Sequence, residues 1–246
     1  MNVKLTSDGY EKSEDFTAEH SPHLTIKKLA LQSFSMNMSW YNISEKYEND
    51  TFKLIEGDKE RIITIPDGNY SVKGLNRYII KLFGKDPPII FGIIEERQRI
   101  SFKLKKNYKM DLRNSDLHQL MGFKSEILNQ EEQEGEYITD ITHGNDNIYI
   151  HCDVIDGALV NNINSDVIYS FVNKTPPGSL ISKDFNNLIF FPEKINNISR
   201  IRMRITNQNN ELIDLNKGRV KYNLLAAYEE DENYLKKIYN LMQNFI

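Results

Sequence analysis

The triplet His151-Cys152-Asp153 is the part of this sequence that looks most like a reactive site, because an imidazole, a thiol and a carboxylate stand side by side. A cysteine nucleophile needs its base within hydrogen-bonding distance of the sulfur. The flanking residues alternate between apolar and polar, which predicts a strand whose successive side chains point to opposite faces. Cys152 would then share an apolar face with Ile150 and Val154, away from His151. We therefore interpret Cys152 as a buried structural cysteine.

The other candidates for chemistry are weaker. The five histidines show no metal-ligand spacing such as HExxH, and one cysteine cannot form a thiolate zinc site. The sequence also lacks the GxSxG, GxxxxGK[ST] and GxGxxG patterns of hydrolases, nucleoside triphosphatases and dinucleotide-binding proteins. We predict no catalytic, cofactor-binding or metal-binding residues, and hence no enzymatic activity.

One predicted strand concentrates positive charge on a single face. Residues 200–205 read RIRMRI, so Arg200, Arg202 and Arg204 point one way and the apolar residues the other. The arginines could contact a carboxylate-bearing neighbouring subunit, contact nucleic acid, or form a solvated face that discourages edge pairing. The formal net charge of −4 does not favour nucleic acid, whose partners usually carry a basic domain.

The end of the sequence predicts an amphipathic helix over residues 229–246. Leu235, Ile238, Met242 and Phe245 recur at spacings of three and four, which places them on one helix face. A helix this short is not stable alone in water, so its apolar stripe must dock either on its own domain or on a neighbouring subunit. These four residues and the three arginines are the candidate subunit contacts.

Length and patterning place the chain among proteins rich in β-structure. The 246 residues can bury a core as one large β domain or as two small domains. Short strand-like segments separated by turn residues predict an all-β sandwich, jelly roll or barrel. The clearest elements are a hairpin at 51–65, a helix from about 72 to 82, a buried strand at 89–94, a short helix at 115–121, and later strands at 137–141, 148–155, 167–172, 188–191, 200–206 and 220–228.

Several phrases of the sequence, taken in order, resemble a known family. They are SFSM and SWYNI within 33–43, IPDGNY at 65–70 with LNRYI at 75–79, LMGF at 120–123, IHCD at 150–153, LV at 159–160, NSDVIY at 164–169, RMRIT at 202–206 and LIDL at 212–215. Their order and spacing are similar to those of the penton, or minor capsid, proteins of Polinton/Maverick elements and the related adintoviruses. The resemblance covers residues from about 24 to 228.

The resemblance implies a structural virion protein rather than an enzyme. It implies a single jelly-roll sandwich that forms homopentamers at icosahedral capsid vertices, beside a double jelly-roll major capsid protein. The expected organisation is a flexible N-terminal arm at 1–23, a jelly-roll domain at 24–228 with an inserted hairpin-helix region at about 44–125, and the C-terminal helix. The alternative is a monomeric jelly-roll or lectin-like binding module with a ligand in a loop pocket.

Sequence features also bear on where the protein is made. No apolar run is long enough to span a bilayer, and residues 1–23 lack the apolar core of a secretory signal. A single cysteine excludes an internal disulfide. We therefore expect synthesis inside the host cell, in the cytoplasm or nucleus, without secretion, and a final location in the virion capsid.

Overall fold

The computed structural model divides the chain into two compact units, and it describes residues 1–157, 159–160, 163–195 and 197–228. The first unit combines Met1–Ser39 with the described residues from Asn145 onward, and the second is the continuous segment Trp40–Gly144. The predicted C-terminal helix lies outside the described residues, and so do its stripe residues Leu235, Ile238, Met242 and Phe245.

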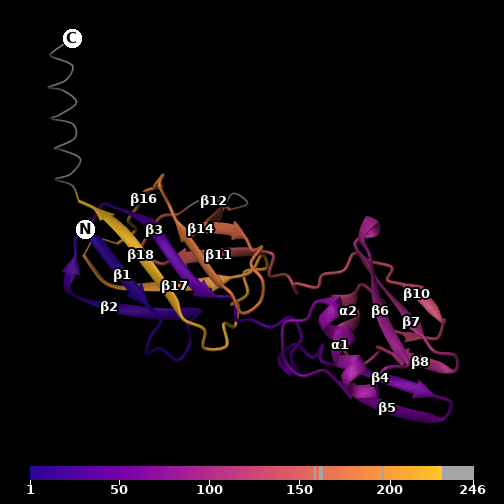
Figure 1. Ribbon diagram of the computed structural model, residues 1–246. Coiled ribbons are helices and arrows are strands. Elements are labelled where there is room, and N and C mark those ends of the chain that lie inside the picture. Colours follow the sequence, from indigo (N-terminus) through magenta and orange to yellow (C-terminus); the bar gives the residue numbers. More distant parts are fainter. Residues whose placement is uncertain (158, 161–162, 196, 229–246) are drawn as a thin grey trace. The chain divides into compact units, whose positions relative to one another are not determined.

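Two antiparallel sheets build the first unit (Figure 1). One sheet has the order β1 (Asn2–Thr6), β18 (Val220–Ala227), β3 (Lys28–Asn37) and β15 (Leu180–Asp184), with β16 (Phe191–Pro192) also paired to β3. The other has the order β14 (Val167–Val172), β11 (Asn147–Cys152), β17 (Ile198–Thr206) and β2 (Asp15–Leu24). A short hairpin of β12 (Leu159–Val160) and β13 (Ile163–Asn164) lies between β11 and β14.

This strand order is that of a jelly roll. Leaving out β16 and the short hairpin, the eight strands in chain order pair as 1-8-3-6 in one sheet and 5-4-7-2 in the other. A jelly roll is a double-sheet sandwich of eight strands connected as two Greek keys. The predicted fold class, a mainly β protein with a jelly-roll sandwich, is confirmed.

Alternation along the strands makes the inner faces of the sandwich apolar. On β17 the side chains of Ile201, Met203 and Ile205 are completely buried, while the arginines between them point outward. Phe34 on β3 lies 5.3 Å, between ring centroids, from Phe171 on β14, and this contact joins the two sheets. The space between the sheets is thus filled by packed side chains.

The expectation of a flexible arm at residues 1–23 is wrong. This segment contains β1 and most of β2, and Val3, Leu5 and Phe16 are buried in the sandwich. Both strands are edge strands whose partners, β18 and β17, lie about two hundred residues later in the chain. Their polar residues occupy the exposed alternate positions, so the local sequence looks like a polar arm although its pairing is non-local.

The second unit contains two small antiparallel sheets and two α-helices (Figure 1). Its elements in chain order are η1 (Glu45–Tyr47), β4 (Thr51–Glu56), β5 (Lys59–Thr64), α1 (Val72–Phe83), β6 (Ile89–Ile94), η2 (Glu95–Arg97), β7 (Arg99–Leu104), β8 (Tyr108–Asp111), α2 (Leu117–Met121), β9 (Ile127–Leu128) and β10 (Glu132–Glu134). The sheets have the orders β5-β4-β8-β9 and β10-β7-β6.

Helix α1 begins and packs as its sequence predicts. The Ser71 hydroxyl accepts a hydrogen bond from the Gly74 N–H at 3.1 Å, which caps the first turn. The buried residues of α1 are Val72, Leu75 and Ile79, at helical spacing. They join a separate core that belongs to the second unit.

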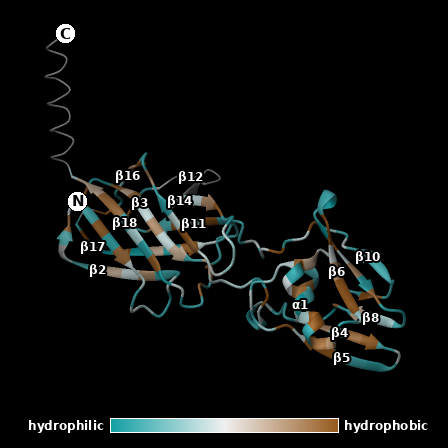
Figure 2. Cartoon of the chain, in the orientation of Figure 1, coloured by the Kyte–Doolittle hydropathy of each residue, from teal (hydrophilic) through white to brown (hydrophobic). Residues whose placement is uncertain are grey.

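Strand β6 is apolar along its length (Figure 2), but it is not buried throughout. Ile89 and Phe91 are buried as expected, whereas the side chain of Ile93 is 58% exposed. Ile93 lies next to the end of β6, where the β6–β7 hairpin turns through η2 and leaves the core. The expectation that the whole strand 89–94 is buried is therefore wrong at Ile93.

Several boundaries differ from the sequence predictions. The second unit extends beyond the expected insertion at about 44–125 on both sides. Residues 137–141 form no strand, because their backbone bonds are irregular: the Tyr137 N–H reaches the Gly122 carbonyl and the Thr139 N–H reaches that of Gln98. Strands β10 and β15 lie where the sequence predicted no strand.

Candidate functional site

The outer face of the β14-β11-β17-β2 sheet carries the three arginines singled out by the sequence. Arg200, Arg202 and Arg204 lie on β17, between β2 on one side and β11 on the other. The predicted alternation is present, with every intervening apolar residue buried. What these arginines can bind depends on the charges that the neighbouring strands place beside them.

Arg202 is paired with a carboxylate of the same chain. Its Nε and Nη2 donate to the two carboxylate oxygens of Asp15 on β2, at 2.7 and 2.6 Å. This hydrogen bonding lowers the pKa of Asp15 below its ordinary value, although burial acts in the opposite direction. The Arg202 backbone N–H also donates to Asp153 Oδ1 at 2.8 Å, so Arg202 ties β17 to both of its neighbours.

Arg204 belongs to a second network, centred on Asp166 just before β14. Arg204 Nη2 lies 2.9 Å from Asp166 Oδ2, and His151 Nδ1 lies 2.6 Å from Asp166 Oδ1. The hydrogen bond from His151, assisted by Arg204, holds the pKa of Asp166 well below its usual range. With Nδ1–H donating to the carboxylate, His151 Nε2 accepts from the Thr206 hydroxyl at 2.9 Å.

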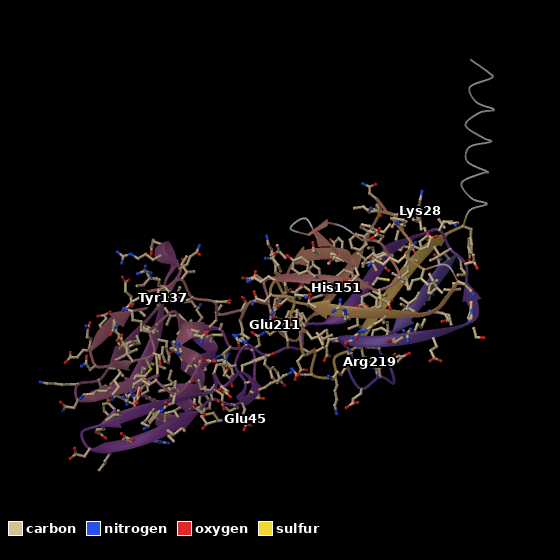
Figure 3. All side chains as sticks on the ribbon, turned by 180° about the vertical axis from the view of Figure 1, so that it is seen from behind. Lys28, Glu45, Tyr137, His151, Glu211 and Arg219 are labelled. Carbon is tan, nitrogen blue, oxygen red and sulfur yellow. The ribbon has the colours of Figure 1, made fainter. Side chains whose placement is uncertain are left out.

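The order Asp166–His151–Thr206 repeats the hydrogen-bond pattern of a catalytic triad. Its position does not suit catalysis, since Thr206 is 1% exposed and His151 is 5% exposed, so no substrate carbonyl could reach the hydroxyl. Figure 3 labels His151 within the ribbon of the first unit. The hydrogen bonds of this network instead hold Asp166, at the end of the β11–β14 connection, against β17.

Cys152 lies on the opposite face from this network, as predicted. Its side chain is completely buried, and burial raises the pKa of the thiol to about 12. A thiol with this pKa is protonated at neutral pH and is not a nucleophile. The prediction that Cys152 is a structural core residue is confirmed.

Carboxylates balance the arginines on this face. Arg200 stands opposite Glu19 of β2 in the strand register, and its charge also acts on Asp153, whose pKa is raised chiefly by burial. With the pairs already described, three arginines share the face with four carboxylates: Asp15, Glu19, Asp153 and Asp166. A surface of this balance does not attract the phosphates of nucleic acid.

A second cluster, which sequence reasoning missed, joins the SWYNI and IPDGNY phrases within the second unit. The Asn42 side chain is 1% exposed and donates from Nδ2 to the carbonyls of Tyr70 and Ile141 at 2.8 and 2.6 Å. Its Oδ1 accepts from the Tyr70 N–H at 2.7 Å, and the Asn42 carbonyl accepts from Asn49 Nδ2 at 2.8 Å. Asn42 thus fastens the start of the unit to its end.

Asp67 completes this cluster. Its carboxylate accepts from the Ser44 hydroxyl at 2.9 Å and from the Glu45 N–H at 3.0 Å. Residues 43 and 68 also form an isolated antiparallel bridge. The family-like phrases therefore encode a structural junction. The available signal was a polar residue within an apolar phrase, since Asn42 and Ser44 flank Ile43 and are themselves buried.

Two classes of site can be set aside for the part of the chain that the structure describes. Its histidines, cysteine and acidic residues form no group of three that could hold a metal ion. Among the same residues, no helix has the length and apolar character needed to cross a bilayer.

The fold and the two clusters define a jelly-roll protein with a second unit inserted between β3 and β11. No family model and no curated protein matches the chain. Among solved structures the chain is similar to the mavirus penton protein, determined in selenomethionine-labelled form. The sequence identity is 10%, the TM-score is 0.44, and the match covers 91% of this chain and 97% of that chain.

Proposed function

We propose that this chain is a structural capsid subunit, a penton or minor capsid protein without enzymatic activity that forms homopentamers at the vertices of an icosahedral virion. The observation that carries the proposal is the strand order 1-8-3-6 and 5-4-7-2, because the jelly roll is an architecture of viral capsid domains. Fold alone does not determine function, so the proposal also needs support from particular residues.

That support comes from the phrases that resemble pentons of Polinton/Maverick elements and adintoviruses. SWYNI and IPDGNY build the junction around Asn42 in the second unit, whereas IHCD and RMRIT lie side by side on β11 and β17 of the jelly roll. The phrases therefore lie at hydrogen-bonded junctions and paired strands in both units. This distribution fits an inherited architecture better than chance similarity of one segment.

The proposed partners are further copies of the same chain and a double jelly-roll major capsid protein. Direct contact of the β17 arginines with packaged nucleic acid is disfavoured, because Asp15 and Asp166 already bind Arg202 and Arg204. Arg200 is exposed, and it is the member of the stripe best placed to contact another subunit.

A test of the proposal is the mass of the purified protein in solution. Five chains of 28.8 kDa give a particle of about 144 kDa, which light scattering separates clearly from the monomer. Fivefold rings in electron micrographs of the same sample would support the vertex assignment. A particle of another symmetry, or a monomer that does not assemble even when mixed with the major capsid protein, would contradict it.

One feature favours the second candidate, a binding module. A hollow at the β1–β2 connection is lined by Asp8, Tyr10, Glu11, Lys217 and Arg219, among other residues, and so combines an aromatic ring with acidic groups in one loop region. This is the composition expected of a lectin-like site. However, the Arg219 Nε lies 3.2 Å from Asp8 Oδ1, which already neutralises part of its charge.

Glycan binding tests this candidate directly. Tyr10 is 41% exposed, and its ring lies tilted against that of Phe16 with the centroids 5.0 Å apart. Tyr10→Ala should therefore abolish binding to a glycan array if the hollow is a sugar site. Arg200→Ala, on the outer face of β17 and not among the residues that line the hollow, serves as the surface control. Absence of any glycan signal from the unaltered protein would exclude the lectin-like function.

A further inference from the structure

The exposed side of helix α1 carries only positive charge. Lys73, Arg77 and Lys81 are exposed and follow one another at intervals of four residues, so they lie in a row along one side of the helix. The opposite side, with Leu75 and Ile79, is buried in the core of the second unit, where α1 packs against β6. We call the three cations the basic face of α1.

No carboxylate balances the basic face of α1 within the part of the chain that the structure describes. The helix contains no acidic residue, and none of the ion pairs between described residues involves this face. The nearest acidic residues in the sequence are engaged elsewhere, since Asp67 accepts from the Ser44 hydroxyl and Asp86 pairs with Lys105. Several exposed cations on the sheets of the same unit do have carboxylate partners: Arg97 with Glu134, Lys103 with Glu132 and Lys124 with Glu136.

This arrangement works against the stability of the helix. Lys73 lies in the first turn, where the helix dipole disfavours positive charge. Lys73 with Arg77, and Arg77 with Lys81, are like charges four residues apart, which is also destabilising. A face that served only solubility would mix both signs, and the chain has 35 acidic residues to 31 basic ones from which to do so. A partner therefore explains the basic face better than solvation does.

We propose that the basic face of α1 is the contact surface for an acidic segment of another protein. Consecutive cations of this face are about 6 Å apart along the helix axis. In an extended polypeptide, alternate side chains share a face and are about 6.6 Å apart. Carboxylates at every second position of such a segment would therefore match the row of cations.

An exposed apolar residue on the same side favours a protein over other anions. Ile80 is 42% exposed and follows Arg77 by three residues, so it lies beside the row of cations. A polypeptide can cover Ile80 with apolar atoms, whereas the phosphates of a nucleic acid bind through charge. A membrane surface is disfavoured because the apolar side of α1 is already buried in the core and cannot enter a bilayer. The inference does not depend on the capsid role, because these charges belong to one helix of one chain.

Fluorescence anisotropy with the full-length chain tests the contact. The probe is a short labelled peptide of alternating glutamate and alanine, and a peptide of alternating glutamine and alanine is its uncharged counterpart. The test variant combines Lys73→Glu, Arg77→Glu and Lys81→Glu. The matched control combines Lys59→Glu, Lys106→Glu and Lys109→Glu, which changes the charge equally at exposed residues in or next to the β4–β5 and β7–β8 turns.

We expect the unaltered chain and the matched control to bind the glutamate peptide and not the glutamine peptide. The test variant should bind the glutamate peptide roughly tenfold or more weakly, because three exposed ion pairs are lost together. Equal weakening in both variants, or no binding by the unaltered chain, would overturn the proposal. Tighter binding to a single-stranded DNA or to phosphatidylserine vesicles, lost in the test variant, would assign the face to phosphates and would also overturn it.

A single substitution separates binding from folding. Lys73→Glu places a negative charge in the first turn and replaces the repulsion from Arg77 by attraction, so it should raise the melting temperature of the second unit. The same variant should bind the glutamate peptide more weakly than the unaltered chain. A lower melting temperature would show that Lys73 supports the helix itself, and this result would overturn the proposal.

Discussion

Replacing Asn42 by alanine should strongly destabilise the second unit. The substitution removes three side-chain hydrogen bonds, two donated by Nδ2 to the Tyr70 and Ile141 carbonyls and one accepted from the Tyr70 N–H. A net hydrogen bond contributes about 1 kcal/mol, and buried groups left without partners add to the cost. We therefore expect a loss of roughly 3 kcal/mol in the free energy of unfolding.

Calorimetry gives the most direct measurement. For a unit of the size of Trp40–Gly144, 1 kcal/mol shifts the melting temperature by about 4–8 °C, so Asn42→Ala should lower the melting temperature of this unit by roughly 12–24 °C. The jelly-roll transition should change much less, since Asn42 makes its side-chain bonds within the second unit.

Asn69→Ala is the matched control for Asn42→Ala. Asn69 lies in the neighbouring phrase and donates one bond of 3.2 Å, from Nδ2 to the Trp40 carbonyl, in a partly buried position. It should cost about 1 kcal/mol or less. If Asn42→Ala were no more damaging than Asn69→Ala, the interpretation of Asn42 as the fastening of the unit would be refuted.

Three further predictions follow from other contacts. Asn76 Nδ2 donates to the Phe91 carbonyl at 2.7 Å and Asn76 Oδ1 accepts from the Phe91 N–H at 2.9 Å, so the Asn76 side chain covers the open edge of β6. Asn76→Ala should expose this edge and increase aggregation in a turbidity assay. An unchanged aggregation rate would argue against this role. Because folding lowers the pKa of Asp166, its stabilising contribution is present above the ordinary pKa of 3.8 and is lost as the pH falls below that value. Asp166→Asn should therefore flatten the dependence of the free energy of urea unfolding on pH below about 4. An unchanged pH dependence would count against the network around Asp166. Phe91 is buried, so Phe91→Ala should lower the free energy of chemical unfolding by about 3–5 kcal/mol. Ile93 is exposed, so Ile93→Asp should have little effect on the stability of the isolated chain. A larger loss of stability for Ile93→Asp than for Phe91→Ala would contradict the exposure of Ile93.

Local periodicity was enough to predict the elements that carry a strong pattern. The alternation of Arg200, Arg202 and Arg204 with buried residues, the capped helix after Ser71 and the buried Cys152 all follow from spacing alone. The strand order of the jelly roll does not follow from spacing, because it depends on pairings such as β1 with β18 across most of the chain. That part of the prediction came from the resemblance.

The polar networks were the least predictable part of the site. Asp166 is separated from His151 by 15 positions and from Arg204 by 38, and no sequence period connects them. Asn42 looked like one asparagine among many in a chain rich in this residue, although its amide is completely satisfied by backbone groups in the fold. In both clusters the tertiary fold brings the hydrogen-bonding partners together. The local sequence around each residue therefore says little about which partners it will bind.

The position of β18 between β1 and β3 has a consequence for the growing chain on the ribosome. Strand β1 has no neighbour in its sheet until β18 has been synthesised, so the jelly roll cannot close before nearly all of its sequence has left the exit tunnel. The second unit is a continuous segment and can fold as soon as Gly144 emerges, since domains generally fold as units during synthesis. Incomplete chains would then carry a finished second unit on an unfinished sandwich. Assembly surfaces that need both sheets would exist only on chains translated through β18, which would keep truncated products out of any shell.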